Sequence, residues 1–142
     1  MDKKILRIID ANQNRALEGI RVCEEITRFI LANKNLTLAF KNLRHRIVST
    51  ARDWNIANLS LLNSRNSAKD AGRASIESEL KRINYKDIFF ANIQRTKESI
   101  RVLEEFSKLK SSKASQGFKN IRYRLYQLEK KTYSKLRYIC GD

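Results

Sequence analysis

Proline is absent from this chain of 142 residues, and glycine occurs only four times. A β-sandwich or β-barrel needs many tight turns, and tight turns depend on these two residues, so the composition argues against both folds. Leu, Ile, Ala, Lys, Arg and Glu are frequent instead, and these residues favour helices. The sequence therefore predicts an all-α fold, and its length suits one domain over residues 1–142.

Long apolar runs and acidic residues are also scarce. No segment approaches ~18 uncharged apolar residues, and no signal-peptide pattern follows Met1, which predicts a cytoplasmic protein rather than a membrane protein. The chain has 15 Asp and Glu against 30 Lys and Arg, a formal net charge of +15. This excess favours an anionic partner, and charge alone does not choose among nucleic acid, a membrane surface and phosphorylated metabolites.

Several motifs of nucleotide and metal sites are missing as well. Cys23 and Cys140 are too few and too far apart to predict a disulfide framework or a zinc site, and we interpret both as structural. The sequence contains neither a P-loop nor a kinase glycine loop. Any phosphate site therefore has to be built in another way.

An internal repeat organises the chain. Residues 11–25 and 91–105 are identical at nine of fifteen positions, with a constant shift of 80 residues. A second match follows each, FKNLRHRI at 40–47 and FKNIRYRL at 118–125, with a shift of 78 residues. Because the order is preserved, a whole helical hairpin is duplicated. Two copies are too few for a solenoid, so we expect the hairpins to pack face to face as a pseudo-twofold four-helix bundle.

The pattern predicts four long helices and a long central loop. The helices are expected at Lys3–Ala32, Leu36–Asp53, Asp87–Leu109 and Ala114–Tyr138, so that repeat 1 covers about 3–53 and repeat 2 about 87–139. Asp87 is expected to cap the third helix, and Gly141 to end the fourth. The loop, residues 54–86, is polar and turn-rich, with one short helix expected near Ile76–Ile83. A connection of this length is often functional.

Polar residues kept in both copies interrupt the apolar helix faces. At about 100° per residue, Asn12 and Arg15 fall on the apolar arc of the first helix, and Asn92 and Arg95 fall on that of the third. A buried Arg needs an anionic partner. Either interhelical ion pairs supply it and set the register of the hairpins, or these residues line a cleft that holds a phosphorylated ligand. The acids available for such ion pairs are Glu18, Glu25, Glu98 and Glu105.

Further candidates lie outside these two helices. Arg44 and Arg122 occupy equivalent places in the second match and are either phosphate contacts or parts of a solvated face. In the central loop, Asp70 lies close to Arg65 and Arg73. A carboxylate for magnesium and cations for a transferring phosphoryl group are the combination that triphosphate chemistry uses.

Four strings carry a resemblance to a known family: IDANQNRALEGIRVCEE at 9–25, LRH at 43–45, SRNSAKDAG at 64–72 and RVLEEF at 101–106. They resemble the monofunctional hydroxymethylpyrimidine phosphate kinases of thiamin biosynthesis, a domain found alone or fused N-terminal to thiamin-phosphate synthase. The family's central-loop pattern reads Arg-Asp-Thr-x-x-Asp-Val-Gly. Here Arg65, Asp70 and Gly72 match it, whereas Asn66 replaces an Asp, which puts a metal role for that position in doubt.

The resemblance implies transfer of the γ-phosphoryl group of ATP to 4-amino-5-hydroxymethyl-2-methylpyrimidine phosphate, with Mg²⁺ as cofactor and thiamin-phosphate synthase as a candidate partner. With the spacing, it predicts Asp70, Arg15 and Arg95 as catalytic residues, with Asp70 holding the metal. Substrate and phosphate binding is expected from Asn12, Asn92, Arg44, Arg65, Arg73, Arg122, Glu18 and Glu98.

Three other functions stay open at this point. The charge suits a basic helical module that binds nucleic acid. A bundle cleft lined by Arg and Glu also suits a cofactor-free mutase or lyase acting on an anionic metabolite. The third alternative is a non-catalytic partner of thiamin-phosphate synthase. The sequence leaves open the oligomeric state, the general base, which repeat binds which substrate, and whether the duplication produced one site or two.

Overall fold

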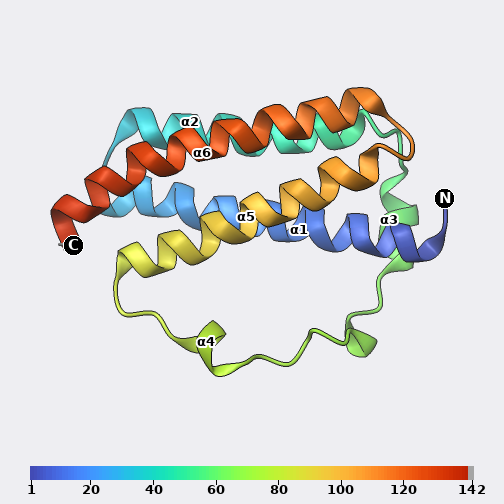
Figure 1. Ribbon diagram of the computed structural model, residues 1–142, viewed down its shortest axis with the longest axis horizontal. Helices are drawn as coiled ribbons and strands as arrows, with labels where there is room; N and C mark the ends of the chain where they lie inside the picture. The colour runs from blue at the N-terminus through green and yellow to red at the C-terminus, as the bar shows by residue number, and fades with distance from the viewer. Residues whose placement is uncertain (141–142) are drawn as a thin grey trace.

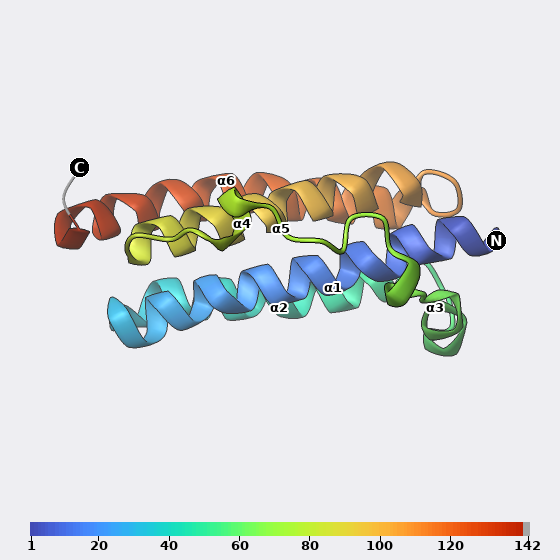
Figure 2. The ribbon, with the colours of Figure 1, turned by 90° about the horizontal axis from the view of Figure 1, so that it is seen from below.

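Four long helices dominate the computed structural model, which describes residues 1–140. They are α1 (Lys3–Glu25), α2 (Lys34–Arg52), α5 (Tyr85–Ser107) and α6 (Ser112–Cys140). Figures 1 and 2 show them lying side by side, with α1 next to α5 and α2 next to α6. Every regular element between residues 1 and 140 is helical, which confirms the predicted all-α class. Gly141, expected to end the last helix, lies outside the described residues.

The first hairpin begins and turns close to the predicted places. Asp2 caps α1 by accepting a hydrogen bond from the backbone N–H of Lys4 at 2.8 Å. The helix continues through a π-helical turn, Ile26–Ile30, and the chain reverses at Ala32, whose φ of 48° is left-handed. The side chain of Asn33 then caps α2 by accepting from the N–H of Leu36 at 2.9 Å.

The second hairpin starts two residues earlier than expected, and the prediction that Asp87 caps it was wrong. The cap is Asn84, whose side chain accepts from the N–H of Asp87 at 3.1 Å. Asp87 in turn accepts from the N–H of Ile83 at 3.0 Å. This reciprocal arrangement resembles a capping box and satisfies two backbone donors, whereas a cap at Asp87 would satisfy one. It therefore sets the start of α5.

Aromatic side chains join the two hairpins in the core. Phe40 of α2 packs edge-on against Phe89 of α5, with ring centroids 6.1 Å apart. Trp54, which follows α2, packs against Phe118 of α6 at 5.6 Å. All four side chains are buried, so each hairpin closes the apolar face of the other.

The predicted polar interruptions of the core are half confirmed. Asn12 is buried and Asn92 is partly buried, but Arg15 and Arg95 are exposed. Neither Arg makes an ion pair with any residue from 1 to 140. The expectation that both are buried was wrong, because the apolar arcs were centred too close to them. Ile9, Ala16, Ile20 and Cys23 form the buried centre of the α1 face, and Arg15 lies about a third of a turn away from that centre.

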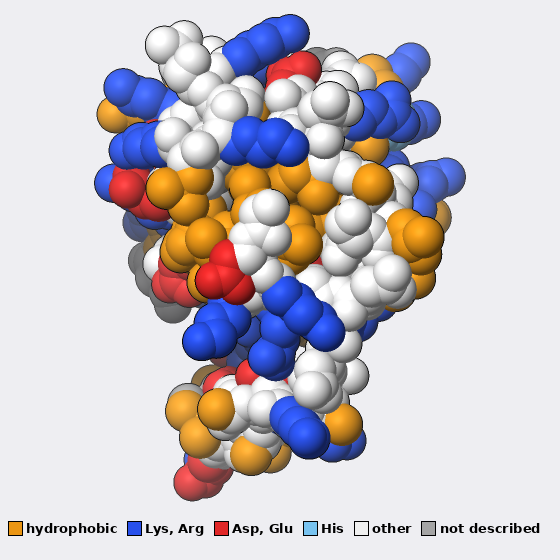
Figure 3. Space-filling view, turned by 90° about the vertical axis from the view of Figure 1, so that its right-hand side faces the viewer, with side chains coloured by type: hydrophobic (Ala, Val, Ile, Leu, Met, Phe, Trp, Pro, Cys, Tyr) orange, Lys and Arg blue, Asp and Glu red, His pale blue; other side chains and the backbone are white. Residues whose placement is uncertain are grey.

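The connection between the hairpins has more structure than predicted. It holds an unpredicted helix, α3 (Asn58–Ser64), a 3₁₀ turn η2 (Ser67–Lys69), and α4 (Glu77–Leu80), which lies inside the predicted Ile76–Ile83 helix. Trp54, Leu61 and Ser64 anchor its first part in the core. From Arg65 to Ile83 the described side chains are all exposed. Figure 3 shows this stretch projecting from the bundle as a narrow lower part.

The helices carry no hydropathy signal for a membrane span. Between residues 1 and 140, none is both long enough and apolar enough to cross a bilayer.

Candidate functional site

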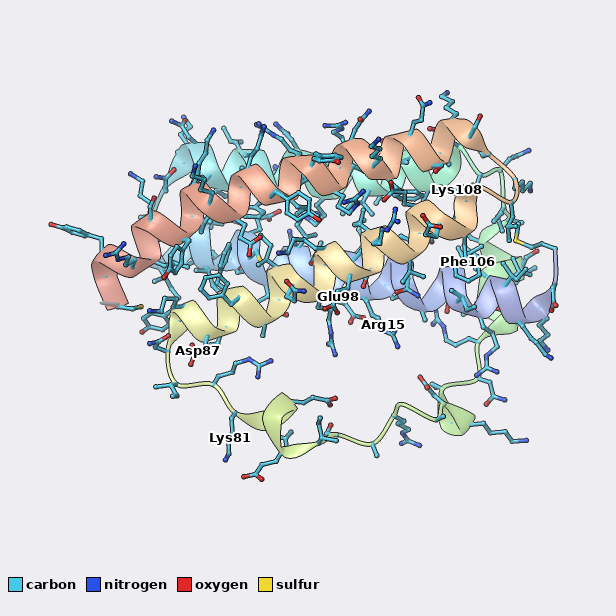
Figure 4. All side chains as sticks on the ribbon, in the orientation of Figure 1. Arg15, Lys81, Asp87, Glu98, Phe106 and Lys108 are labelled. Carbon is cyan, nitrogen blue, oxygen red and sulfur yellow. The ribbon has the colours of Figure 1, made fainter. Side chains whose placement is uncertain are left out.

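A cleft of about 650 Å³ lies between α1 and the central connection. Five predicted site residues line it: Asn12, Arg15 and Glu18 from α1, and Arg65 and Asp70 from the connection. Asn12 and Asp70 are 58 positions apart, so the fold brings together two predicted motifs that are distant in the sequence. Figure 4 shows Arg15 near the middle of α1.

Other lining residues were missed by the sequence reasoning. They are Lys4, Arg7, Ile8, Asp10, Ala11, Asn14, Asn66 and Ser67. On α1 these positions recur at intervals of three or four residues, so they form one stripe beside the buried face. That polar stripe was visible in the sequence, but only the part repeated in both hairpins was used. The cleft combines basic groups, amides and a few carboxylates.

A two-bond ion pair joins the central connection to α1 in the lining of the cleft. The Nε of Arg65 donates to Oδ2 of Asp10 at 2.8 Å, and its Nη2 donates to Oδ1 at 2.9 Å. Such bidentate pairs fix the plane of the guanidinium as well as its position. Asp10 is only 8% exposed, whereas nearly half of the Arg65 side chain reaches solvent. The hydrogen bonds that Arg65 donates to Asp10 raise the pKa of the Arg65 guanidinium, which stays charged.

Two further contacts shape the rim. The Nη2 of Arg7 donates to the backbone carbonyl of Asn66 at 3.4 Å, next to the Asp10 pair. Asp70 is exposed and bends the chain, because its Oδ1 accepts from the N–H of Gly72 at 2.9 Å. The first contact holds the connection onto α1, and the second engages only Oδ1 of the exposed Asp70 carboxylate.

The carboxylates fit magnesium only together with a phosphorylated ligand. No group of three or more His, Cys, Asp or Glu suited to a metal occurs in the part of the chain that the structure describes. Asp10 is already engaged by Arg65. Asp70 and Glu18 are exposed carboxylates of the cleft, and one carboxylate is enough when substrate phosphates and water complete the six ligands of Mg²⁺.

Arg44 and Arg122 lie elsewhere, in matching ion pairs between the helices of each hairpin. Arg44 Nε donates to Glu24 at 3.0 Å, and Arg122 Nε donates to Glu104 at 2.8 Å. Both acids are buried and belong to the repeated string. The ion pairs expected for Arg15 and Arg95 with Glu18, Glu25, Glu98 or Glu105 do not occur among residues 1–140. The interhelical pairs that do occur join Arg44 to Glu24 and Arg122 to Glu104.

Each buried acid also meets a second Arg on its own helix. Arg21 contacts Glu24 at 2.9 Å, and Arg101 contacts Glu104 at 3.1 Å. Burial by itself would raise the pKa of Glu104, but the hydrogen bonds from Arg122 and Arg101 outweigh it and hold the pKa below its usual value. Glu104 is therefore ionised at neutral pH.

The remaining predicted residues lie outside the cleft. The side chain of Asn92 donates to the carbonyl of Ile88 at 2.8 Å, the same bond that Asn12 makes to Ile8. Arg95 is exposed on α5, and Glu98 accepts from Gln94 at 2.9 Å. Arg73 is exposed in the connection. The structure thus collects the first-repeat residues at one cleft and leaves their second-repeat counterparts apart from it.

Comparison with known proteins identifies the family. The sequence pattern of the ThiD2 family matches residues 7–131. The chain belongs to the ThiD2 family. No solved structure matches it significantly.

Curated relatives of this ThiD2 chain are named thiamine-phosphate synthase. The protein from Rhodopirellula baltica is 38% identical over 125 residues, which cover 87% of this chain and 33% of the relative. The protein from Prochlorococcus marinus strain SARG is 36% identical over 129 residues, 90% of this chain and 36% of the relative. The protein from Nostoc sp. strain PCC 7120 is 39% identical over 126 residues, which cover 88% of this chain and 34% of the relative. The chain spans about a third of the length of these relatives, and the resemblance to a thiamin-biosynthesis family is confirmed.

Proposed function

We propose that this ThiD2 chain is a phosphotransferase of thiamin biosynthesis that moves the γ-phosphoryl group of ATP onto 4-amino-5-hydroxymethyl-2-methylpyrimidine phosphate. The observation that carries the proposal is the cleft of about 650 Å³, because basic side chains of α1 line it together with Arg65 and Asp70. Membership of the ThiD2 family and similarity to proteins named thiamine-phosphate synthase support the pathway.

The chemistry asks for placement and charge rather than for a base. A phosphate oxygen of the acceptor attacks the γ-phosphorus of ATP, the bond from that phosphorus to the β,γ-bridging oxygen breaks, and ADP leaves with the electron pair. The acceptor phosphate loses its second proton near pH 6, so its oxygen is already nucleophilic at neutral pH. What remains is to align the two anions and to offset their charge.

The residues of the cleft can align the two substrates and offset their negative charge. We assign Arg15 and Arg65, with Arg7, to the phosphate oxygens, because guanidinium groups match phosphate geometry. Asp70 would hold Mg²⁺, which when bound would offset the negative charge of the ATP phosphates. Asn12 and Glu18 complete the α1 wall beside the apolar floor of Ile8 and Ala11.

Predicted residues outside the cleft take secondary places in the proposal. Arg95, Asn92 and Glu98 belong to α5, which packs along α1, so we place them at the neighbouring edge of the substrate site. Arg73 follows Asp70 and would reach the triphosphate from the connection. Arg44 and Arg122 already neutralise buried acids, and we assign them to holding each hairpin together.

We also infer that the single domain arose by duplication of one hairpin and packs as a pseudo-twofold four-helix bundle. Equivalent bonds support this: Asn12 and Asn92 each bond the carbonyl four residues earlier, and Arg44 and Arg122 each bond a buried Glu. Repeat 1 would then cover about 3–53 and repeat 2 about 87–139.

One observation favours a second function, nucleic-acid binding. Helix α2 carries five Lys and Arg with no acid, and α6 carries eight with the single acid Glu129, so these two helices hold most of the net charge. Figure 1 shows them on the side away from the central connection, and Figure 3 shows Lys and Arg on both flanks of that half. Such a face predicts RNA affinity that falls steeply with salt. Absence of binding to a single-stranded RNA at low salt would exclude this function.

Docking to thiamine-phosphate synthase is compatible with the first proposal, since the relatives carry that name. As the sole role of the chain it predicts no turnover, so the same assay separates the two.

The test is coupled turnover. Protein, Mg²⁺, ATP and the pyrimidine phosphate are incubated with a separate thiamin-phosphate synthase and thiazole phosphate, and thiamin phosphate is measured. We expect ATP-dependent product, its loss in Asp70→Ala, and normal product from Asp53→Ala, whose surface pair with Lys113 lies outside the cleft. A flat trace from folded wild-type protein would refute the kinase function.

A further inference from the structure

The two repeats differ at the positions that build the cleft. Shifted by 80 residues, Arg7 corresponds to Asp87 and Asp10 corresponds to Phe90. Asp87 is used in the cap of α5, and the ring of Phe90 packs against Tyr133 at 5.0 Å. The second repeat therefore has an aromatic contact where the first has a buried carboxylate.

That carboxylate reaches a residue outside both hairpins. Asp10 accepts both bonds of Arg65, and the amide of Asn14 also donates to its Oδ1 at 3.4 Å. The neighbouring contact from Arg7 to the carbonyl of Asn66 holds the same point of the connection. Residues 54–86 occur once in the chain. A carboxylate at the equivalent position of the second repeat would therefore have no connecting segment to bind.

The pair leaves Arg65 ready to bind an anion. A guanidinium has five N–H donors, and Asp10 takes two of them, at Nε and Nη2. The Nη1 group and the second hydrogen of Nη2 make no hydrogen bond to residues 1–140, and Arg65 lines the cleft with 46% of its side chain exposed. A long Arg side chain free in water would lose rotamer freedom when it binds, whereas Asp10 has already fixed this one.

We infer that Asp10 is a positioning residue that holds Arg65 toward the phosphate of the ligand, and that the chain consequently has one phosphate-ester site, formed by the first repeat and the connection. The inference rests on the proposed function for the class of ligand, a phosphorylated metabolite or nucleotide. It gives Asp10 no contact with the reacting atoms. The assignment also answers the question of one site or two that the duplication raises.

Calorimetric titration tests it without turnover. Mg²⁺ with a non-hydrolysable ATP analogue, and separately the pyrimidine phosphate, are titrated into the full chain, its Asp10→Asn, Arg65→Gln and doubly substituted variants, and Asp53→Asn as the matched control. We expect one site per chain for whichever probe contacts Arg65, about tenfold weaker binding in Asp10→Asn, and unchanged binding in Asp53→Asn. Because Asp10 acts through Arg65, the double variant should bind no more weakly than Arg65→Gln alone.

Turnover by the same proteins gives a readout that a purely structural role would not move. Asp10→Asn should raise KM for the affected substrate by a similar factor while the unfolding transition stays that of a folded protein. If Asp10→Asn does not fold, Arg65→Gln and Arg65→Lys serve instead, since Arg65 is half exposed and lysine cannot form the two-bond pair.

Distinct results overturn the inference and the proposed function. Two sites per chain, wild-type affinity in Asp10→Asn, fully additive losses in the double variant, or no binding of either probe would overturn the positioning role. One site with the expected variant pattern but no product in the coupled assay would leave the positioning role standing and refute the kinase.

Discussion

Gly19 and Asn92 meet where α1 crosses α5. A Cβ atom placed on Gly19 would lie 2.8 Å from the backbone carbonyl oxygen of Asn92 and 2.4 Å from the hydroxyl of Thr96. That hydroxyl donates to the same carbonyl at 2.9 Å. Contact this close lets the two helices pack backbone against backbone, and only glycine leaves room for it.

Gly19→Ala should therefore destabilise the protein, by about 2 kcal/mol as expected for an overpacked core. The Thr96 side chain can turn away, but the Asn92 carbonyl belongs to the helix and cannot. Urea unfolding monitored by circular dichroism measures the change. Gly72→Ala is the control, because its nearest neighbour would be Asp70 Oδ1 at 3.6 Å, and equal stabilities of the two variants would contradict the prediction.

Glu104 should make stability fall in acid. Its pKa in the folded protein lies below the ordinary value of 4.5, because the bonds from Arg122 and Arg101 outweigh burial. A carboxyl group of this kind contributes stability that is fully present above the unfolded pKa and is lost as pH falls through the folded pKa. Unfolding free energy should thus decline below about pH 4.5.

Glu104→Gln should remove that part of the decline and cost roughly 2–3 kcal/mol at pH 7, since bonds to charged groups are lost and the Arg partners stay behind. Glu77→Gln is the matched control, because Glu77 pairs with Lys81 on the surface. The measurement is denaturant unfolding from pH 3 to 7. If the unfolding free energies of Glu104→Gln and wild type fell by the same amount between pH 7 and pH 3, titration of Glu104 would not cause the loss of stability in acid.

Cys23 should resist alkylation in the folded protein. Burial raises the pKa of its thiol, and the Sγ lies 3.8 Å from the carbonyl of Phe89 inside the core. Cys140 is partly exposed in the last turn of α6. Iodoacetamide at pH 8 should modify Cys140 first, and Cys23 only after denaturant is added, as peptide mass spectrometry will show. Equal rates for the two thiols in native protein would mean that α1 opens readily.

Under the proposed function, Asp70→Asn should lower the affinity for Mg²⁺ that turnover reports, without affecting the fold. The side chain is exposed, and an amide still accepts the bond from Gly72 while losing the charge that attracts the metal. We expect the Mg²⁺ concentration for half-maximal rate to rise about tenfold, with an unchanged unfolding transition. An unaltered magnesium requirement would move the metal away from Asp70.

Much of the fold follows from local signals. The missing proline, the repeat and the apolar periodicity placed the four long helices to within a few residues. The start of α5 was missed because Asn84 and Asp87 can both cap, and only the pair of reciprocal bonds decides between them. Helix α3 was missed because its seven residues give too short a window for periodicity.

The site was harder to predict because it depends on contacts between distant residues. The comparison of the two repeats drew attention to Arg15 and Arg95. It passed over Asp10, whose counterpart in the second repeat is Phe90. A residue that breaks the repeat gives no signal when a chain is compared with itself. The pairing of Asp10 with Arg65 joins positions 55 residues apart, which no helical period reveals.

The connection is longer than its span demands. Figure 1 shows that it leaves the end of α2 and returns at the opposite end of the bundle, where α5 begins. A helix of 23 residues is about 35 Å long, and roughly ten extended residues cover that distance. Since loop entropy changes only by ~0.6 kcal/mol for each doubling of length, a chain in which a short linker replaces residues 67–83 should still fold. The surplus residues are then a separable part of the chain. Without them the long helices would still pack together, whereas the magnesium site that we propose at Asp70 would be lost.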